Sequence, residues 1–394
     1  MKNKPMSSRS RQQTVLLGIV GMYWFSQYVY MPYQTPYLLS IGTAASLAGI
    51  IVGAYGFTQL LLRLPIGLMA DRKGRHKPFI LLGTASVGAA SLLRTLFPNE
   101  TGFLCANLLA GMASAMWISF MVLYSGYFRA EEMQKAMGRI IAVNNLGILF
   151  GFLAGTLLYD HTGMQFLCIL SCVVSIPAVA LAFFIREPGP DLPRLPVHEL
   201  VRVYLDKKLL LFSLFALIQQ GILMSTCMSF TTEIAKQRGA SGWEIGLCSI
   251  VYIAAAVASS YFSSSNTAIK LGGRAWIPLI FGCLGLYCIL IPLVPNVWWI
   301  YPVQVLAGAS TGILFPFCTS EAMQNVPPEK KSTAMGFFQA VYAVGMTFFP
   351  IVTGAFAQSF GLPAAFYFLA ALAAVGIAAA LIYYRKEHRS HENT

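Results

Sequence analysis

Charged residues are scarce along this chain of 394 residues. Asp, Glu, Lys and Arg make up 11% of it, and hydrophobic residues make up 57%. Soluble domains carry about 25% charged residues. No stretch here is polar enough to form one, and the mean hydropathy is +0.65. The chain is therefore expected to lie mostly in a lipid bilayer.

Side chains that bind metals or act as catalysts are also missing from the apolar runs. The five histidines fall in loops or at the ends of these runs, and there is no H-E-x-x-H sequence. The eight cysteines form no C-x-x-C pair, so we interpret them as small core residues. The sequence thus argues against an intramembrane enzyme, and we expect neither a metal nor a cofactor.

Twelve apolar runs are long enough to cross a bilayer, which takes about 20 residues. They predict an all-α integral membrane protein, with the runs at 14–39, 44–70, 78–97, 102–127, 135–160, 164–185, 209–234, 242–264, 275–294, 298–322, 333–358 and 362–384. A Pro-rich polar segment, 186–208, divides them six and six. We expect tails at 1–13 and 385–394, a half at 14–185, this linker, and a second half at 209–384.

The positive charges indicate the orientation. The net charge is +12, but the cations sit in short loops, so they suggest topology and not a nucleic-acid partner. With both termini inside, 23 of the 27 Lys and Arg residues fall on the inner side. Arg94, Lys236 and Arg238 are expected outside, and Arg63 lies within a span. This asymmetry predicts cytoplasmic termini.

The two sets of six runs carry traces of a duplication. Ala136-Met137-Gly138 reappears as Ala334-Met335-Gly336 at an offset of 198 residues, and Leu109-Ala110-Gly111 reappears as Leu306-Ala307-Gly308 at 197. Gly147 and Gly163 likewise match Gly345 and Gly361. Parallel repeats of this kind are a transporter design in which substrate binds between the halves.

The loop after the second run reads G-L-M-A-D-R-K-G-R-H-K from position 67. It resembles the signature of the major facilitator superfamily, G-x-x-x-D-R-x-G-R-R, with His76 in place of an Arg. The resemblance implies a twelve-helix secondary transporter with two six-helix repeats. It also implies that a cytoplasmic latch joins the two halves through Gly67, Asp71, Arg72, Gly74 and Arg75.

Two other family patterns are only partly present. In the fourth span, Asn107 stands where the family pattern has an Arg linked to proton coupling, which puts drug–proton exchange of the usual form in doubt. In the fifth span, Gly138, Gly147, Gly151 and Gly155 resemble the antiporter motif, although Phe152 replaces its proline. These glycines favour an exporter or, alternatively, only serve close helix packing.

Polar and aromatic residues nevertheless occur inside four spans. The resemblance implies that the first, fourth, seventh and tenth spans line the cavity. The candidate cavity residues are Tyr23, Trp24, Gln27, Tyr30, Asn107, Ser114, Trp117, Gln220, Met224, Gln304, Thr311 and Phe315. Each could instead join helices as interhelical glue. Together they suit a moderately apolar or neutral organic molecule.

Acidic residues are absent from the middle of every span. The candidates for proton coupling are therefore Asp160 and Glu233 near outer helix ends and Glu321 near an inner one. Charges in the membrane are costly and usually functional, so protons are partners only if one of these carboxylates carries them.

The sequence favours an alternating-access secondary active transporter of a small organic solute across the plasma (inner) membrane. The leading hypothesis is efflux of an amphipathic or drug-like compound, and the alternative is import of a neutral metabolite of the sugar or nucleoside type. A channel or a receptor is disfavoured by the duplication and the loop signature. The expected partners are the solute and the lipid bilayer, and a monomer is expected.

Overall fold

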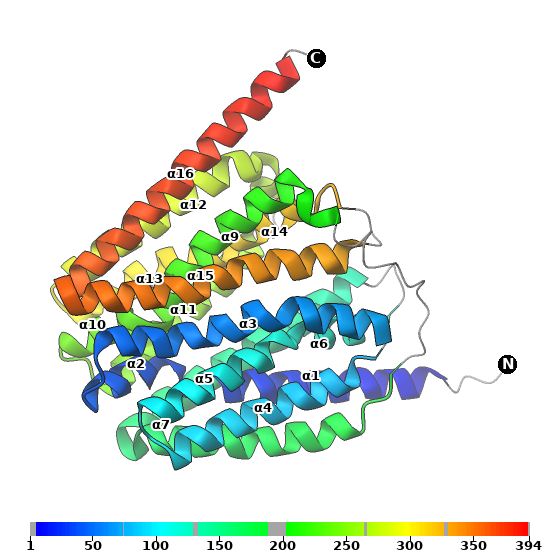
Figure 1. Cartoon of the computed structure of the whole chain (residues 1–394), viewed down its shortest axis with the longest axis horizontal. Helices are drawn as coiled ribbons and strands as arrows, with labels where there is room; N and C mark the ends of the chain where they lie inside the picture. The colour runs from blue at the N-terminus through cyan, green and yellow to red at the C-terminus, as the bar shows by residue number, and fades with distance from the viewer. Residues whose placement is uncertain are drawn as a thin grey trace.

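The chain folds into a bundle of helices. The computed structural model describes residues 5–73, 75–128, 133–187, 202–263, 266–326 and 330–392, and within these ranges it contains helices and no strand (Figure 1). The predicted fold class is thereby confirmed.

The first half contains five long or paired helical segments. They are α1 (Pro5–Tyr28) with α2 (Met31–Ser40), α3 (Ala45–Lys73), α4 (Lys77–Leu96), α5 (Glu100–Ala115) with α6 (Trp117–Ser125), and α7 (Met133–Phe183). The α7 segment holds two predicted spans, because Gly163 turns the chain between them with a φ of +73°. Only glycine adopts such an angle without strain.

The second half begins with a short 3₁₀ turn, η2 (Arg202–Leu205). It continues with α9 (Lys207–Ser225), η3 (Thr226–Phe230), α10 (Thr231–Gln237), α11 (Gly242–Ser263), α12 (Asn266–Leu293), η4 (Val297–Trp299), α13 (Ile300–Ala309), η5 (Ser310–Leu314), α14 (Phe315–Met323), α15 (Lys331–Phe360) and α16 (Leu362–Glu392). Every predicted span has a helical counterpart. In the described ranges, ten helical stretches are long and apolar enough to cross a membrane, and Arg139–Phe183 among them contains two predicted spans.

Four spans are interrupted partway along their length. The first span breaks between Tyr28 and Met31, and the fourth breaks at Met116. The seventh and tenth contain the π-helical segments η3 and η5. Such segments are frequent at functional sites. The interrupted spans are the four that the family resemblance assigns to the cavity.

The interruptions follow the repeat found in the sequence. The offset of 197 carries Val29, in the first break, to Thr226 and Met116 to Ile313, so each break in the first half falls on a π segment in the second. Gly163 and its match Gly361 both have a positive φ, +73° and +84°. The duplication is therefore visible in the backbone as well as in the sequence.

A tyrosine contact is repeated in the same way. The Tyr55 hydroxyl lies 2.6 Å from Ser114 Oγ, and the Tyr252 hydroxyl lies 2.8 Å from Thr311 Oγ1. Both members of the first pair shift by 197 residues to give the second pair. The two halves thus share side-chain hydrogen bonds between equivalent helices.

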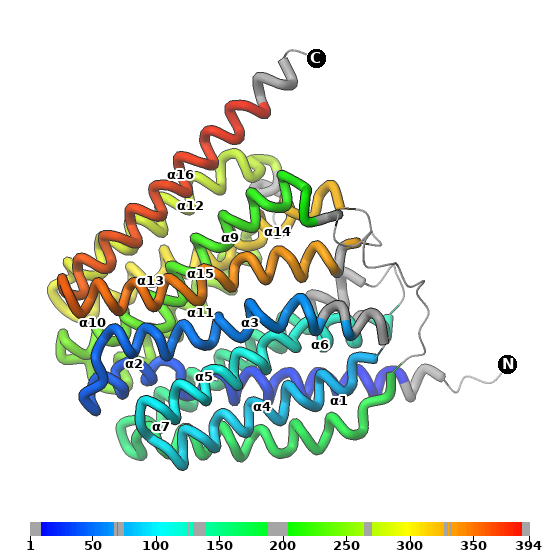
Figure 2. The backbone as a smooth tube through the Cα atoms, in the orientation of Figure 1, coloured from blue at the N-terminus to red at the C-terminus, as the bar shows by residue number. Residues whose placement is uncertain are grey.

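The two halves lie side by side and meet along α3 and α15. Figure 2 shows the first half in blue to green tones in the lower part and the second half in green to red above it. A Cβ atom at Gly49 would lie 2.2 Å from the carbonyl oxygen of Pro350, and one at Gly53 would lie 2.4 Å from that of Thr347. Small residues therefore let the two helix backbones touch.

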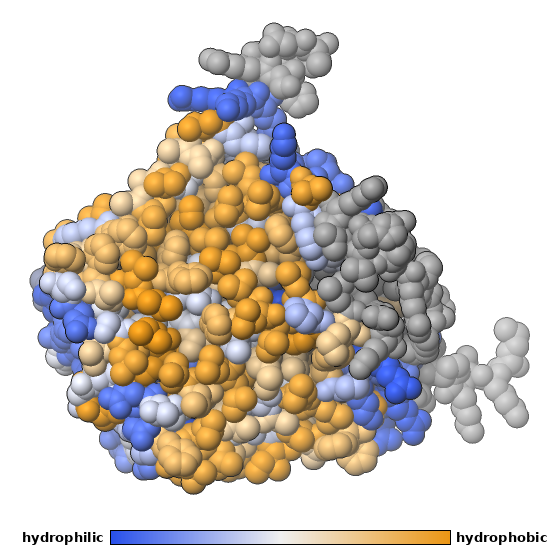
Figure 3. Space-filling view, viewed as in Figure 1, coloured by the Kyte–Doolittle hydropathy of each residue, from blue (hydrophilic) through white to orange (hydrophobic). Residues whose placement is uncertain are grey.

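The outer surface is apolar over most of its area. In Figure 3 hydrophobic residues cover most of the visible face, and hydrophilic residues gather toward its edges. On α7 alone, Phe150, Leu157, Ile176 and Phe183 are each more than half exposed. Large exposed apolar areas suit contact with lipid.

Candidate substrate cavity

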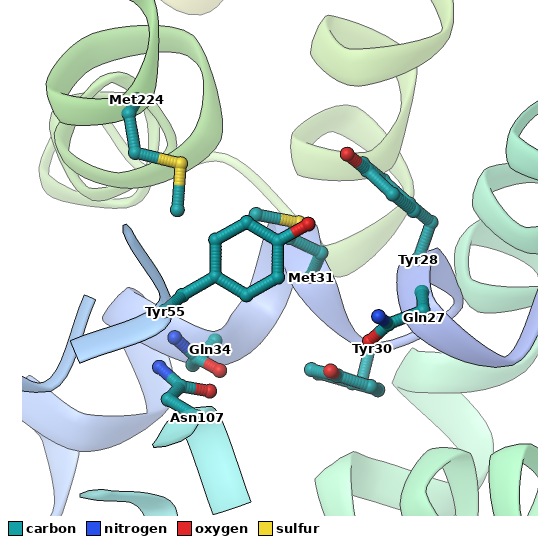
Figure 4. Close-up of a pocket in the computed structure, with 8 residues that line it drawn as sticks. All are labelled: Gln27, Tyr28, Tyr30, Met31, Gln34, Tyr55, Asn107 and Met224. Carbon is teal, nitrogen blue, oxygen red and sulfur yellow. The ribbon is translucent and has the colours of Figure 1, made fainter. Parts of the chain in front are cut away.

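A small cavity lies where the break between α1 and α2 faces α3, α5 and α9. Its volume is about 10 Å³, which is room for about one water molecule. Its lining residues are Gln27, Tyr28, Tyr30, Met31, Gln34, Tyr55, Asn107 and Met224. Met224 comes from the second half, so the cavity borders both halves. Figure 4 shows Tyr55 between Met224 on one side and Gln34 and Asn107 on the other.

Hydrogen bonds fix the polar side chains of one wall. Gln27 Nε2 donates to the carbonyl oxygen of Ala110 and to Ser114 Oγ, both at 3.1 Å. Ser114 in turn bonds to the Tyr55 hydroxyl. Gly111 makes this approach of α3 and α5 possible, because a Cβ there would lie 2.2 Å from the Tyr55 carbonyl oxygen.

Arg94 stands behind the opposite wall. Its Nη2 donates to Asn107 Oδ1 at 2.6 Å, and its Cζ lies 4.1 Å from the centre of the Tyr30 ring. The side chain is only 1% exposed. The cation count placed Arg94 on the outer side of the membrane, and nothing in the structure tests that side. No feature of the sequence indicated its burial, which arises because the last turn of α4 points it inward against α5.

Arg63 is the second arginine inside the bundle, as predicted. It is 5% exposed, and its Nη1 donates to the carbonyl oxygen of Gln339 in α15 at 3.0 Å. Its Nη2 also donates to Gln59 Oε1. The guanidinium lies 4.8 Å from the Tyr342 ring centre, so Arg63 links the two halves.

Four of the twelve candidate cavity residues line the cavity. They are Gln27, Tyr30, Asn107 and Met224. Ser114 lies directly behind them through its bonds to Gln27 and Tyr55.

Tyr23, Trp24 and Trp117 form an aromatic cluster beside the cavity. Trp24 lies 5.2 Å from Trp117 and 5.3 Å from Tyr23 between ring centres. Among the described residues, the Trp24 Nε1 and the Tyr23 hydroxyl are buried without a hydrogen-bond partner. Their accessibility to substrate stays a prediction.

The other candidates from the second half do not line the cavity. Gln304 Oε1 lies 3.4 Å from the Cys227 sulfur, which is also 3.2 Å from the Tyr287 hydroxyl oxygen. Thr311 bonds to Tyr252 as described above. Gln220 is half-buried on α9, and Phe315 packs against Tyr342 with ring centres 5.8 Å apart.

Tyr28, Met31, Gln34 and Tyr55 line the cavity but were not among the candidates. Tyr28 lies off the helical stripe that selected its neighbours, and Tyr55 lies on a span not expected to line the cavity. A signal for Tyr55 was present, since Tyr55 and Ser114 recur as Tyr252 and Thr311 at the offset of the repeat.

Apart from the Arg63–Gln339 bond, the side-chain hydrogen bonds between the halves described here gather at one end of the bundle. We call it the distal end, and we call the end that holds residues 187 and 202 the linker end. At the distal end the Tyr33 hydroxyl donates to the Gly242 carbonyl oxygen at 3.0 Å, and Thr35 Oγ1 lies 2.9 Å from Ser229 Oγ. Lys236 Nζ donates to the Pro36 carbonyl oxygen at 2.8 Å.

Asp160 closes the same end. Its two carboxylate oxygens accept hydrogen bonds from the backbone N–H groups of Gly242 and Trp243, at 2.8 and 2.9 Å. A carboxylate at a helix N-terminus is favourable because it meets unsatisfied N–H groups and the positive end of the helix dipole. The first half thus caps a helix of the second, and the distal end is closed.

Comparison with known proteins identifies the family. A sequence profile described as Major Facilitator Superfamily matches residues 16–264 and 213–394, which together cover almost the whole chain. The chain belongs to the major facilitator superfamily. It is a multi-pass membrane transporter and not an enzyme, and the resemblance seen in the sequence is confirmed.

Individual relatives are distant. The chain is 25% identical to the inner membrane transport protein YajR of Escherichia coli (strain K12) over 266 residues, which are 64% of this chain and 57% of YajR. It is 27% identical over 314 residues to the multidrug resistance protein MdtG of Salmonella choleraesuis (strain SC-B67), covering 76% of each.

Solved structures of the superfamily share the fold at low identity. A bacterial homologue of the human lysosomal transporter Spinster, inward-facing and unoccupied, has a TM-score of 0.78 at 15% identity, covering 98% of both chains. A mutant of the nucleoside transporter NupG has a TM-score of 0.74 at 13% identity, covering 95% of this chain and 99% of its own.

The superfamily signature after α3 lies only partly within the described residues. Asp71 and Arg72 belong to the last turns of α3, but the structure does not describe their side chains. Gly74 and the surroundings of Gly67 also lie outside the described residues. Arg75 is exposed. The latch therefore stays a prediction for this superfamily member.

Glu187 meets the end of this signature. Its Oε1 accepts hydrogen bonds from the backbone N–H groups of His76 and Lys77, which begin α4. Burial lowers the pKa of His76 below its usual value, and the Glu187 charge opposes this only in part. Burial thus favours the neutral form of His76, whereas the superfamily usually has an Arg there.

The three candidate coupling carboxylates have different surroundings. Asp160 is bonded to two N–H groups, and Glu321 forms an ion pair of 2.7 Å with Lys208. Glu233 is 7% exposed, accepts one bond from Gln237 at 3.0 Å, and leaves its Oε2 buried without a partner among the described residues. Within the same ranges, no group of His, Cys, Asp and Glu is suited to hold a metal ion.

Proposed function

We propose that this transporter works by alternating access and exports an amphipathic organic compound. The supporting observation is a cavity that borders both halves of a duplicated bundle, below a distal end sealed by hydrogen bonds between the halves. A carrier needs such a site and a seal that opens when the other side closes.

Export is supported by two features. The multidrug resistance protein MdtG is a relative along three quarters of the chain. The glycines that resemble the antiporter motif also pack tightly: a Cβ at Gly147 would lie 2.6 Å from the Gly21 carbonyl oxygen, and one at Gly155 would lie 2.4 Å from that of Val29. This stripe holds α7 against α1, next to the cavity.

Import of a neutral metabolite, of the sugar or nucleoside type, is the second candidate. The likeness to NupG concerns the fold alone, so it supports this alternative less than the relationship with MdtG supports export. The amide groups of Gln27 and Gln34 at the cavity favour this importer, because amides can hydrogen-bond to the hydroxyl groups of such a metabolite.

The proposed location is the inner membrane with both termini in the cytoplasm. The distribution of Lys and Arg and the name of YajR support this location. The distal end, which is closed in the state described here, would then face outward. The proposal also includes a monomer built from two halves, at 14–185 and 209–384, with the linker at 186–208.

A reversible disulfide tests the proposal. In a background without the eight native cysteines, the double variant Thr35→Cys/Ser229→Cys is reconstituted in vesicles. The flux of a panel of drugs and metabolites is then measured with and without a pH gradient. Because the two hydroxyl oxygens lie 2.9 Å apart, oxidation should lock the distal end and stop transport, and a reductant should restore it.

The controls are the two single variants, which should transport with and without oxidant. Full flux through the oxidised, cross-linked protein would contradict alternating access. Uptake into the cell in place of export would favour the metabolite importer.

A further inference from the structure

Two buried arginines have no acidic partner among the described residues. Arg63 and Arg94 are both at least 95% buried. Within the described part of the chain the ion pair found is Lys208–Glu321, which lies at the linker end and involves neither arginine. The cavity lining contains no Asp or Glu.

Arg94 lies one side chain away from the cavity. It contacts Tyr30 and Asn107, and both of these line the cavity. Asn107 is a neutral partner that does not compensate the charge: its Oδ1 accepts from Arg94, and its Nδ2 donates to the Ile51 carbonyl oxygen at 2.7 Å. Across the described ranges, Arg94 Nε and Nη1 are buried without hydrogen-bond partners.

Arg63 adds charge from another side. The described residues that it bonds to are uncharged, Gln59 and the Gln339 carbonyl oxygen, and its Nε has no partner among them. On α3 it lies two turns from the cavity residue Tyr55. One fixed cation, Arg94, therefore adjoins the cavity, and a second lies two helix turns away from it.

Unpaired buried charge is expensive. Removing an ion from water costs several kcal/mol even after the protein relaxes. Ionisable residues are kept inside a membrane protein mainly where they have a function. A negative group in the cavity would compensate both arginines, and its attraction to them would be strong because the surroundings screen charge poorly.

We propose that the substrate is an organic anion, with one acidic head group and an apolar body. This deepens the proposed export function and rests on it. The Gln27 and Gln34 amides and the Tyr55 hydroxyl are polar groups near the head group, and Met31 and Met224 provide an apolar surface for the body. Organic cations are disfavoured because no carboxylate lines the cavity and two guanidinium groups repel them.

The test compares ligands of one shape and three charges. The probes are 2-naphthoate, its methyl ester and 2-naphthylmethylammonium, together with decanoate, methyl decanoate and decylammonium. Binding to the detergent-solubilised full chain is measured from the rise in the thermal unfolding midpoint, and flux is measured in vesicles. The wild type should bind and transport the two carboxylates, and should bind the esters and amines at least about tenfold more weakly.

Variants locate the effect. Arg94→Gln should weaken carboxylate binding about tenfold and abolish the preference over the ester, whereas Arg94→Lys should keep part of it. Arg238→Gln is the matched control, because Arg238 donates to the Pro292 carbonyl oxygen in a different part of the molecule. It should bind like the wild type.

Three outcomes would overturn the inference. They are esters or amines that bind as tightly as the carboxylates, a charge preference that survives Arg94→Gln, and no binding by any carboxylate. The first comparison uses the wild type alone, so it does not depend on the folding of a variant. Transport of the neutral or cationic probes would refute the inference that the substrate is an anion, but it would not contradict the proposed export function. Absence of flux for every probe and for the drug panel would refute both.

Discussion

Tyr55 and Tyr252 occupy equivalent positions in the two halves, yet Tyr55 borders the cavity and Tyr252 does not. Each bonds to a hydroxyl group on the neighbouring helix. The duplication therefore preserved the hydrogen bond while the surroundings diverged. Because of this asymmetry, comparing variants of Tyr55 and Tyr252 tests which half recognises the substrate.

We expect Tyr55→Phe to raise the KM for transport more than Tyr252→Phe does. Losing one hydroxyl at the cavity should raise KM about two- to tenfold, since a hydrogen bond contributes about 0.5–1.5 kcal/mol. Tyr252→Phe should change KM by less than about twofold. Flux at several substrate concentrations and matched protein levels measures both, and equal effects would contradict the assignment of the cavity to Tyr55.

Single residues were harder to predict than their chemical types. Periodicity selected Gln27 and Asn107, which line the cavity described here, because each lies on a helical stripe of polar residues. It missed Arg94, because a cation near the end of an apolar run looks like a loop residue until its contacts with Asn107 and Tyr30 are known. Tertiary contacts of this kind leave no trace in local sequence.

Whole helices followed the sequence closely, since length and hydropathy determine which segments enter a bilayer. The interruptions did not. The segment Thr226–Phe230 contains neither Gly nor Pro, so no common helix-breaking residue predicts the interruption there. The hydroxyls of Ser225 and Thr226 donate to the carbonyl oxygens of Gly221 and Ile222 just before it. Such back-bonding competes with the helix and accompanies bends.

The contact between α3 and α15 depends on a missing side chain at Gly49. Gly49→Ala should lower the thermal stability by about 1–3 kcal/mol, because the new Cβ would collide with the Pro350 carbonyl oxygen and push the helices apart. Gly18→Ala is the matched control on α1, where a Cβ meets nothing within 4 Å.

The control should be neutral or stabilising by up to about 1 kcal/mol, because Ala favours a helix over Gly. Thermal unfolding midpoints in one detergent measure both variants. If the two midpoints coincide, close contact at Gly49 contributes nothing to stability.

For the whole molecule, the open question is the driving force. A pH gradient is expected to drive transport weakly, because the fourth span carries Asn107 in place of the coupling arginine and an amide cannot titrate. Of the three candidate carboxylates, Asp160 and Glu321 have firm partners in the described structure, whereas Glu233 leaves one oxygen unbonded there. Glu233 is thus the best candidate for exchanging a proton.

We expect Glu233→Gln to remove the pH-gradient dependence that the parent shows, and Glu321→Gln to leave it unchanged. Uptake into vesicles with an imposed gradient measures this for the parent, for the single variants and for the combination with Asp160→Asn. Strong proton-driven accumulation that persists in the triple variant would show that coupling uses none of these carboxylates.

The glycine contacts between α3 and α15 also bear on the speed of transport. At Gly49 and Gly53 backbone approaches backbone, with the Ile351 side chain packed against Gly53. Where side chains interdigitate, one half could turn against the other only after several rotamers changed together, and each such change would add to the activation barrier. In the alternating access proposed above, close backbone contact at these glycines would let the halves rotate while they stay in van der Waals contact. Reorientation would then have to break the bond from Arg63 to the Gln339 carbonyl oxygen farther along α3, together with the hydrogen bonds at the distal end.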